Sequence, residues 1–345
     1  MNNPNTTFTI LIGVFIAIAL FGKLNSVPMG HEEPRRAIIA QEIVESGDIW
    51  QPTLKGINYY RKPPLYNWFI ALFYKVSGSQ NEFVTRLPSV ISFIFFIFSI
   101  YLFFKRFIAK TDARIVAFFV FISGDILLYY SRMAEMDLFY SLISFPVLVL
   151  PWYYLNQKKL VYFFTIAPFL AGIGFLAKGL PSLVFIAISS FVAIIINKQY
   201  KLLYNPLILL SIFCFLIPVL PYFTNQNLSG NLGESIASLM GESVNRASNG
   251  GVLKYVFHVL SFPVIVFFGF LPGSLALFGI KKTISKKPLV KVLFTLFAVN
   301  FLVYLISPGA KIRYVYMFFP FMAYFACLGY KQFNDKIKQH GLYIS

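Results

Sequence analysis

The chain contains eleven apolar segments, and this feature restricts its fold more than any other. A helix crosses about 30 Å of hydrocarbon with roughly 20 apolar residues. Charged residues are only 12% of the sequence and the mean hydropathy is +0.70, which excludes a water-soluble enzyme and a disordered chain. We therefore expect an all-α polytopic membrane bundle of about 10–11 spans, forming a single domain over residues 1–345. The apolar segments are 7–25, 64–78, 87–104, 114–130, 138–155, 160–177, 180–196, 202–223, 252–280, 290–307 and 313–330.

Charge distribution predicts the orientation of these segments. The chain has 30 basic and 13 acidic residues, an excess that the positive-inside rule explains better than nucleic-acid binding. The number of spans depends on the short segment 64–78. If this segment lies at the interface and does not span, 16 of the 30 basic residues fall in loops on one side of the membrane. We therefore expect ten spans plus interfacial helices, with both termini cytoplasmic and no C-terminal soluble domain. The expected external loops are 26–86, 131–137, 224–251 and 307–313.

The first external loop carries two adjacent carboxylates, Glu32 and Glu33, before a predicted helix. Pro34 suits the first turn of that helix and Gly47 suits its C-terminal cap. Residues 37–46 form an amphipathic pattern typical of a helix lying in the membrane interface. The carboxylates either complement the helix dipole or act as a general base at the membrane surface.

Cations in the external loops indicate an anionic ligand. Arg61 and Lys62, after Tyr60 and before two prolines, either extend to lipid headgroups or clamp a phosphate. Lys178, at the end of a span, is an interface anchor or a phosphate contact. Lys311 and Arg313 lie in an external turn, against the positive-inside trend.

Two further loops contain acidic residues. Glu135 and Asp137 could hold a divalent cation through oxygen ligands, although an ion pair with Arg132 is favoured over a metal. Glu242 and Arg246 are spaced for a helical salt bridge, in a segment that is either a solvated loop or a lid.

Seven short motifs together resemble the bacterial aminoarabinose transferase and protein O-mannosyltransferase superfamily, which are membrane glycosyltransferases of the GT-C class. The resemblance runs in order over about residues 26–320, and Glu32 and Arg61 replace an Asp and a Glu that are usual in members. The motifs are EEPR (32–35), ESGDIW (45–50), YRKPPL (60–65), NEF with RLPS (81–89), RMAEMD (132–137), LAKG (176–179) and KIRY (311–314).

The resemblance implies a GT-C fold in the cytoplasmic membrane and transfer, with inversion, of a sugar from a polyprenyl-phosphate-linked donor. The acceptor is a lipid, such as lipid A, a glycan or a protein, on the external face. Two alternatives stay open: a transporter or flippase for a lipid-linked anion, and a non-catalytic scaffold. No cofactor is certain, and nucleic acid is not expected as a partner. The implied site has Glu32 or Glu33 as the catalytic base and the donor phosphate among Arg61, Lys62, Lys178, Lys311 and Arg313. Supporting residues are Arg35, Tyr60, Arg132, Glu135, Asp137, Glu242, Arg246 and Tyr314.

Overall fold

The computed structural model describes residues 14, 16–22, 24–248, 251–281 and 287–339, although the side chains of 242–248 and 335–339 are not described. Nearly all the regular structure is helical, and the two strands form a single short hairpin. The elements of the first lobe are α2 (Glu33–Ser46), β1 (Thr53–Leu54), β2 (Ile57–Asn58) and α3 (Leu65–Ser77). The remaining elements are α4 (Glu82–Phe104), α5 (Lys110–Phe121), α6 (Gly124–Leu128), η1 (Tyr130–Arg132), α7 (Met136–Asn156), α8 (Leu160–Lys178), α9 (Pro181–Ile196), η2 (Tyr200–Tyr204), α10 (Ile208–Leu228), α11 (Leu232–Ser248), α12 (Val252–Gly269), η3 (Gly273–Gly279), α13 (Pro288–Leu305), η5 (Ile312–Phe318) and α14 (Phe319–Gln339).

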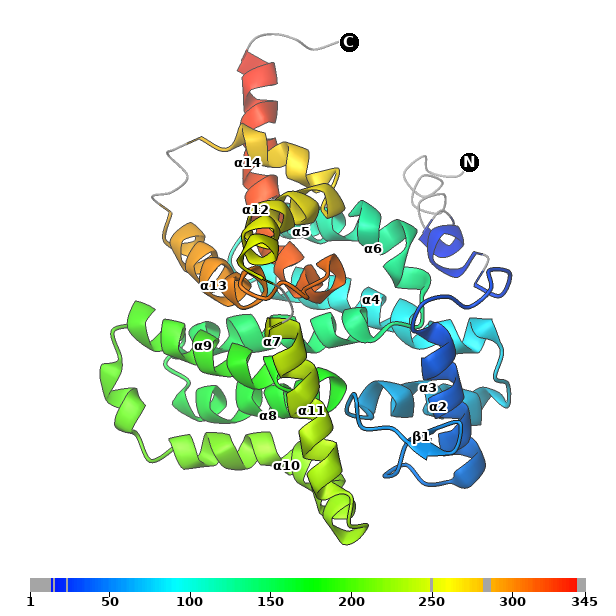
Figure 1. The fold of residues 1–345 in the computed structure, drawn as a ribbon. Coiled ribbons are helices and arrows are strands. Elements are labelled where there is room, and N and C mark those ends of the chain that lie inside the picture. Colours follow the sequence, from blue (N-terminus) through cyan, green and yellow to red (C-terminus); the bar gives the residue numbers. More distant parts are fainter. Residues whose placement is uncertain (1–13, 15, 23, 249–250, 282–286, 340–345) are drawn as a thin grey trace, which may run out of the picture.

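Helix α7 lies at the centre of the bundle. It packs against α4, α8, α9 and η5, and α10 covers the outer side of α8 (Figure 1). The most apolar stretch of α7 is 67% buried, and that of the η5–α14 segment is 83% buried, whereas those of α10 and α12 are only 11% and 17% buried. Apolar side chains that the protein does not cover are expected to face lipid, so α10 and α12 lie at the periphery.

The all-α polytopic fold is confirmed, but fewer helices can span than the apolar segments suggest. Within the described residues, seven helices are long and apolar enough to cross a membrane, or eight if the bent pair formed by residues 110–121 and 124–132 is one span. The predicted segment 114–130 is broken there by a 54° bend. The segment 180–196 forms a helix of 16 residues, and residues 7–13, 15 and 23 of segment 7–25 lie outside the described residues.

The segment 64–78 forms helix α3, which has 13 residues. At 1.5 Å per residue this helix is about 20 Å long, shorter than the hydrocarbon layer. Tyr66, Ile70 and Tyr74 are buried on one face, while Val76 on the other is exposed. These dimensions agree with the expectation that this segment does not span.

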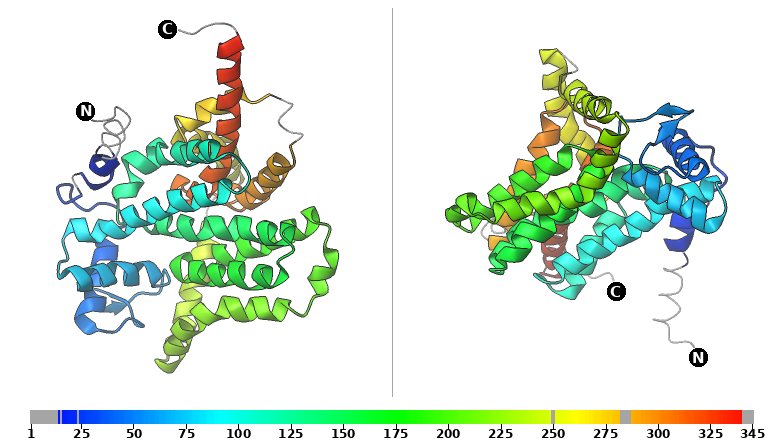
Figure 2. Two further views of the ribbon diagram at one scale, coloured as in Figure 1. Left: turned by 180° about the vertical axis from the view of Figure 1, so that it is seen from behind. Right: turned by 90° about the horizontal axis from the view of Figure 1, so that it is seen from below.

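Helix α2 confirms the predicted helix boundaries and corrects its environment. Pro34 is in its first turn, and Gly47 caps its end with a φ of 72°, a left-handed conformation that glycine adopts without strain. The apolar face of Ile39, Ala40 and Ile43 is not available to lipid, because it packs against α3. Seen from two sides, α2, the hairpin and α3 form a lobe beside the bundle (Figure 2).

The predicted loop 224–251 is largely helical. Helix α10 continues to Leu228, and α11 begins at Leu232 after a turn at Gly230, which has a φ of 74°. The abundance of Asn, Ser and Gly in this segment favoured a loop, yet tertiary placement overrides such weak propensities. Glu242 and Arg246 belong to α11, but their side chains lie outside the described part of the chain.

Candidate active site

A buried cluster of charges occupies the end of the bundle where α7 begins. Arg313 Nη1 donates to Glu135 Oε1 at 2.5 Å, and Arg313 Nε is 3.2 Å from Asp137 Oδ2. Glu135 has an extended backbone just before α7, with φ −113° and ψ 139°, so it and Asp137 approach the same cation despite being two residues apart. The expected flanking of one cation is therefore observed, but the cation is Arg313. Arg132 instead donates to the carbonyl of Leu128.

Lys178 joins this cluster from the end of α8. Its Nζ donates to Asp137 Oδ1 at 2.5 Å and lies 4.2 Å from the centre of the Tyr314 ring. It is also 4.8 Å from the Tyr140 ring, so two aromatic faces and a carboxylate fix its position. Helix α8 ends at Gly179, which has a φ of 87°. The chain can therefore turn directly into α9 while holding the Lys178 side chain inside.

Burial shapes the acidity of Glu135. Loss of water raises the pKa of Glu135 to about 7, and the neighbouring charge of Asp137 contributes in the same direction. The cations Arg313 and Arg36 oppose this rise. Because Arg313 holds Glu135 and Lys178 holds Asp137, these carboxylates are engaged as counter-ions. The described residues contain no group of three or more His, Cys, Asp or Glu able to hold a metal, so the suggested divalent cation finds no support here.

The two adjacent glutamates of the first loop point to different surroundings. Glu33 is fully buried and accepts from Arg86 Nε at 2.8 Å and Arg86 Nη2 at 3.0 Å. Its carboxylate also accepts from the backbone N–H groups of Ala134 and Gly30, at 2.8 and 3.1 Å. With all its acceptor positions used, Glu33 is placed to hold the first loop onto the bundle. This geometry does not favour the catalytic role that the sequence suggested for it.

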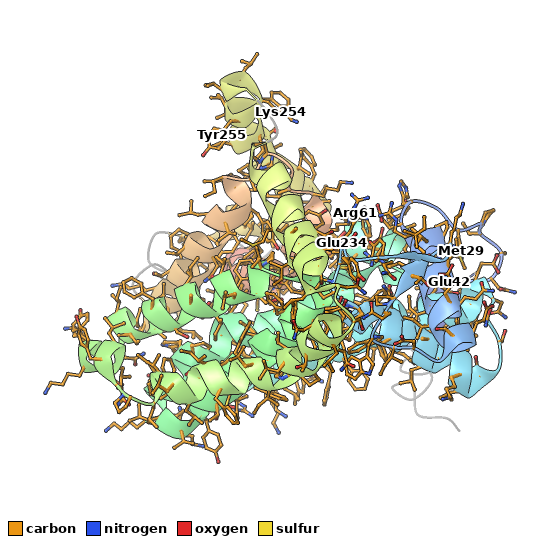
Figure 3. All side chains as sticks on the ribbon, turned by 60° about the horizontal axis from the view of Figure 1, so that its bottom comes forward. Met29, Glu42, Arg61, Glu234, Lys254 and Tyr255 are labelled. Atoms are coloured by element: carbon orange, nitrogen blue, oxygen red, sulfur yellow. The ribbon has the colours of Figure 1, made fainter. Side chains whose placement is uncertain are left out.

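Glu32 faces a polar cavity instead. Its Oε2 accepts from Arg35 Nη1 at 2.5 Å, and about a third of each of these two side chains is exposed. The cavity has a volume of about 610 Å³ and is lined by residues of the first lobe, the start of α7, α11, α12 and the η5 region. Two of its lining residues, Arg61 and Lys254, are labelled in Figure 3. Its walls are formed by Glu32, Arg35, Arg36, Tyr59, Arg61, Lys62, Glu135, Met136, Asp137, Lys178, Ser238, Gly241, Lys254, Gly309, Lys311, Arg313 and Tyr314.

The cavity brings together most of the residues singled out from the sequence. All five expected phosphate-binding cations line it, and Arg61 and Lys311 are exposed at its mouth, while Lys178 and Arg313 are buried in its wall. Tyr60 is placed elsewhere: it is buried and its hydroxyl donates to Gln51 at 3.2 Å. Arg132 lines a neighbouring cavity.

Sequence reasoning missed Arg36, Arg86 and Lys254. Arg36 and Glu33 are three residues apart, and the buried positions of α2 continue through Ile39, Ala40 and Ile43. A cation on the apolar stripe of an amphipathic helix was the available signal. Arg86 stands in one of the seven motifs without an assigned role, and Lys254 begins α12 in a segment that is otherwise strongly apolar.

Comparison with known proteins finds membrane glycosyltransferases. Residues 61–224 match the family model for dolichyl-phosphate-mannose-protein mannosyltransferase. A relative in Proteus mirabilis, named undecaprenyl phosphate-alpha-4-amino-4-deoxy-L-arabinose arabinosyl transferase 2, is 25% identical over 95% of this chain and 59% of its own length. A transferase of the same type in Pseudomonas savastanoi pv. phaseolicola is 29% identical over 43% of this chain and 28% of its own length.

Solved structures agree on the fold. ArnT from Cupriavidus metallidurans bound to undecaprenyl phosphate has a TM-score of 0.74 at 15% identity, covering 97% of this chain and 63% of that one. The family match, the named arabinosyl transferases and the shared ArnT fold together support a membrane glycosyltransferase of the GT-C class. A more distant GT-C structure, the Archaeoglobus fulgidus oligosaccharyltransferase, has a TM-score of 0.52 at 14% identity, covering 96% of this chain and 49% of that one. The seven long apolar helices among the described residues, together with the ArnT-like fold, support a multi-pass membrane protein. The chain spans about three fifths of the length of the Proteus relative and of the ArnT structure.

Proposed function

We propose that this GT-C protein transfers a sugar from a polyprenyl-phosphate-linked donor to an acceptor on the external face of the cytoplasmic membrane. One observation carries the proposal: a single cavity holds a carboxylate, Glu32, opposite cations that come from distant parts of the chain. Relatives named for an undecaprenyl phosphate-linked aminosugar, and the fold shared with a protein bound to undecaprenyl phosphate, support this class of donor. Modification of lipid A is one such transfer, and the acceptor here is a lipid, glycan or protein.

The donor phosphate is assigned to the mouth of the cavity. Lys178 and Arg313 are held by Asp137 and Glu135 in the wall, so their charges are largely balanced. Arg61, Lys62 and Lys311 approach from two separate loops. Cations at this position would stabilise the negative charge that develops on the phosphate as it leaves.

Glu32 is assigned as the general base. The acceptor hydroxyl attacks the anomeric carbon, a new carbon–oxygen bond forms, and the bond from that carbon to the phosphate oxygen breaks. The hydroxyl proton passes to Glu32, and the electron pair of the broken bond leaves with polyprenyl phosphate. Attack opposite the leaving group inverts the anomeric configuration. Arg35 donates to Glu32 Oε2 and so fixes the position of the carboxylate in the cavity.

Release of undecaprenyl phosphate by purified protein in lipid nanodiscs tests the proposal. The donors are undecaprenyl phosphate-linked aminoarabinose and mannose, the two sugars named among the relatives, and a total membrane lipid extract supplies acceptors. We expect Glu32→Gln to reduce release at least about hundredfold, with donor binding retained. Gln41→Glu, on the exposed side of the same helix, serves as the matched control and should leave the rate unchanged.

Near-wild-type release by Glu32→Gln would remove Glu32 as the base. Donor binding without release by the wild-type protein would favour the scaffold. Net transport of the donor across the bilayer of liposomes that contain the protein, without sugar transfer, would favour the flippase.

A further inference from the structure

Arg36 occupies an unusual position for a cation. It lies on the buried stripe of α2, one turn after Glu33 and one turn before Ile39 and Ala40, and only 4% of its surface is exposed. The aliphatic part of an Arg can rest against apolar neighbours while its guanidinium reaches a polar region. In this case the polar region is the cavity, because Arg36 is one of the residues that line it.

The Arg36 guanidinium has unused donors. Its Nε and Nη1 atoms are buried and make no hydrogen bond to any described residue, and Nη2 lies 4.0 Å from the sulfur of Met136. Arg86, also buried, provides the contrast, since it pairs with Glu33 and donates to the backbone carbonyls of Leu24 and Val27. A carboxylate and backbone carbonyls accept from the buried guanidinium of Arg86, whereas no described group accepts from Nε or Nη1 of Arg36.

The carboxylates of the cavity wall are already engaged elsewhere. Glu32 pairs with Arg35, Glu135 with Arg313, and Asp137 with Lys178. Burying a charge without a partner carries a large desolvation penalty. Arg36 interacts with the charge of Glu135 but its Nε and Nη1 donate to no carboxylate, and these free donors are explained most simply by an anion that binds there. The Nε–H and Nη1–H groups lie on different edges of the guanidinium, so each is free to donate to one oxygen of a phosphate or carboxylate.

The cavity carries more positive charge than the phosphodiester of the donor requires. Among the described residues that line it are eight Lys or Arg and three Asp or Glu. A sugar phosphodiester carries about one negative charge, and the exposed cations Arg61 and Lys311 at the mouth are placed to meet it. Arg36 lies apart from these, on the buried wall beside Met136.

We propose that Arg36 binds a second anionic group of the substrates, a phosphate or a carboxylate, in addition to the donor phosphodiester. The inference deepens the proposed function and rests on it. Arg36 is thereby a specificity-determining residue, which selects either an acceptor that carries an anion or a donor sugar that carries one.

A phosphorus NMR titration of the purified full chain in detergent micelles tests the proposal, with inorganic phosphate as the probe and undecaprenyl phosphate already bound at saturation. We expect the wild-type protein to bind phosphate alongside the lipid, and Arg36→Met to weaken phosphate binding about tenfold or more. The affinity for undecaprenyl phosphate should change less than about threefold. Arg106→Gln, an exposed arginine on the loop after α4 and outside the cavity, is the control and should bind both probes as the wild type does.

Two outcomes separate the sources of the anion. If the donor sugar supplies it, the wild type binds undecaprenyl phosphate-linked glucuronate about tenfold tighter than the mannose conjugate, and Arg36→Met removes the preference. If the acceptor supplies it, the two donors bind equally and phosphate binds beside both.

Thermal stability distinguishes binding from a structural role. Because an unpaired buried charge destabilises the ligand-free protein, Arg36→Met should raise its melting temperature. A lower melting temperature, with phosphate binding to the lipid-loaded protein unchanged, would overturn the inference. Failure of the wild type to bind undecaprenyl phosphate would instead count against the proposed function itself.

Discussion

The two adjacent glutamates of the first loop offer a sharp test of the structure, because the same substitution should lower stability strongly at Glu33 and only slightly at Glu32. Glu33→Gln leaves the Arg86 guanidinium buried beside a neutral amide. Glu33 accepts four hydrogen bonds, two of them from Arg86. Removing one charge of a buried pair costs about 3–5 kcal/mol. Arg86 keeps its bonds to the carbonyls of Leu24 and Val27, so we expect the lower end, about 3 kcal/mol.

The matched change Glu32→Gln breaks a pair that is about one-third exposed, and such pairs contribute less than about 1 kcal/mol. Unfolding by sodium dodecyl sulfate in mixed micelles, followed by tryptophan fluorescence, measures the free energy of unfolding of both variants. Trp68 packs against α2 and its neighbours and reports on this lobe. Equal stability of the two variants would refute the assignment of Glu33 as a structural anchor. A double-mutant cycle of Glu33→Gln and Arg86→Met measures the coupling energy between the Glu33 and Arg86 side chains.

Three further results are expected. Asp137→Asn should lower the free energy of unfolding by about 3 kcal/mol, because Lys178 loses its buried counter-ion; a calorimetric scan showing no change would contradict the charge cluster. Burial, aided by Asp137 and opposed by Arg313, raises the pKa of Glu135 to about 7. The protonated Glu135 carboxyl therefore stabilises the folded protein fully below its ordinary pKa, and this stabilisation is lost as pH rises through about 7. Between about pH 5 and about pH 8 the wild type should lose more thermal stability than Glu135→Gln. Glu42 accepts from a threonine hydroxyl and two backbone N–H groups of the hairpin, and Glu42→Ala should cost about 1–3 kcal/mol and expose the hairpin to limited proteolysis; undiminished resistance to protease would argue against that role.

Much of the fold follows from patterns that are local in the sequence. Long apolar segments identify the helices, and Pro34 and Gly47 mark the two ends of α2. The number of spans could not be obtained in this way, because hydropathy does not report where a helix breaks. The bend after α5 depends on tertiary contacts, including the bond from the Gly124 N–H to the carbonyl of Leu271.

The sequence identified many of the residues that line the cavity, but not the partners that those residues contact. Lys62 was identified from a pair of cations before two prolines, and Lys311 from a loop whose cations oppose the expected charge asymmetry; both residues line the cavity. Pairing over long sequence separations was out of reach, since Glu135 meets Arg313 from 178 residues away. For the same reason the sequence could not distinguish Glu32 from Glu33, because their roles depend on which helix face meets Arg86.

Binding of a polyprenyl phosphate in the cavity can be detected by native mass spectrometry of gently extracted protein. We expect a bound mass equal to a polyprenyl phosphate or its sugar conjugate, and we expect Lys62→Gln combined with Lys311→Gln to weaken the binding of this lipid. A conjugate would also identify the class of sugar. Protein that carries no such lipid, and that fails to bind added undecaprenyl phosphate, would contradict the account.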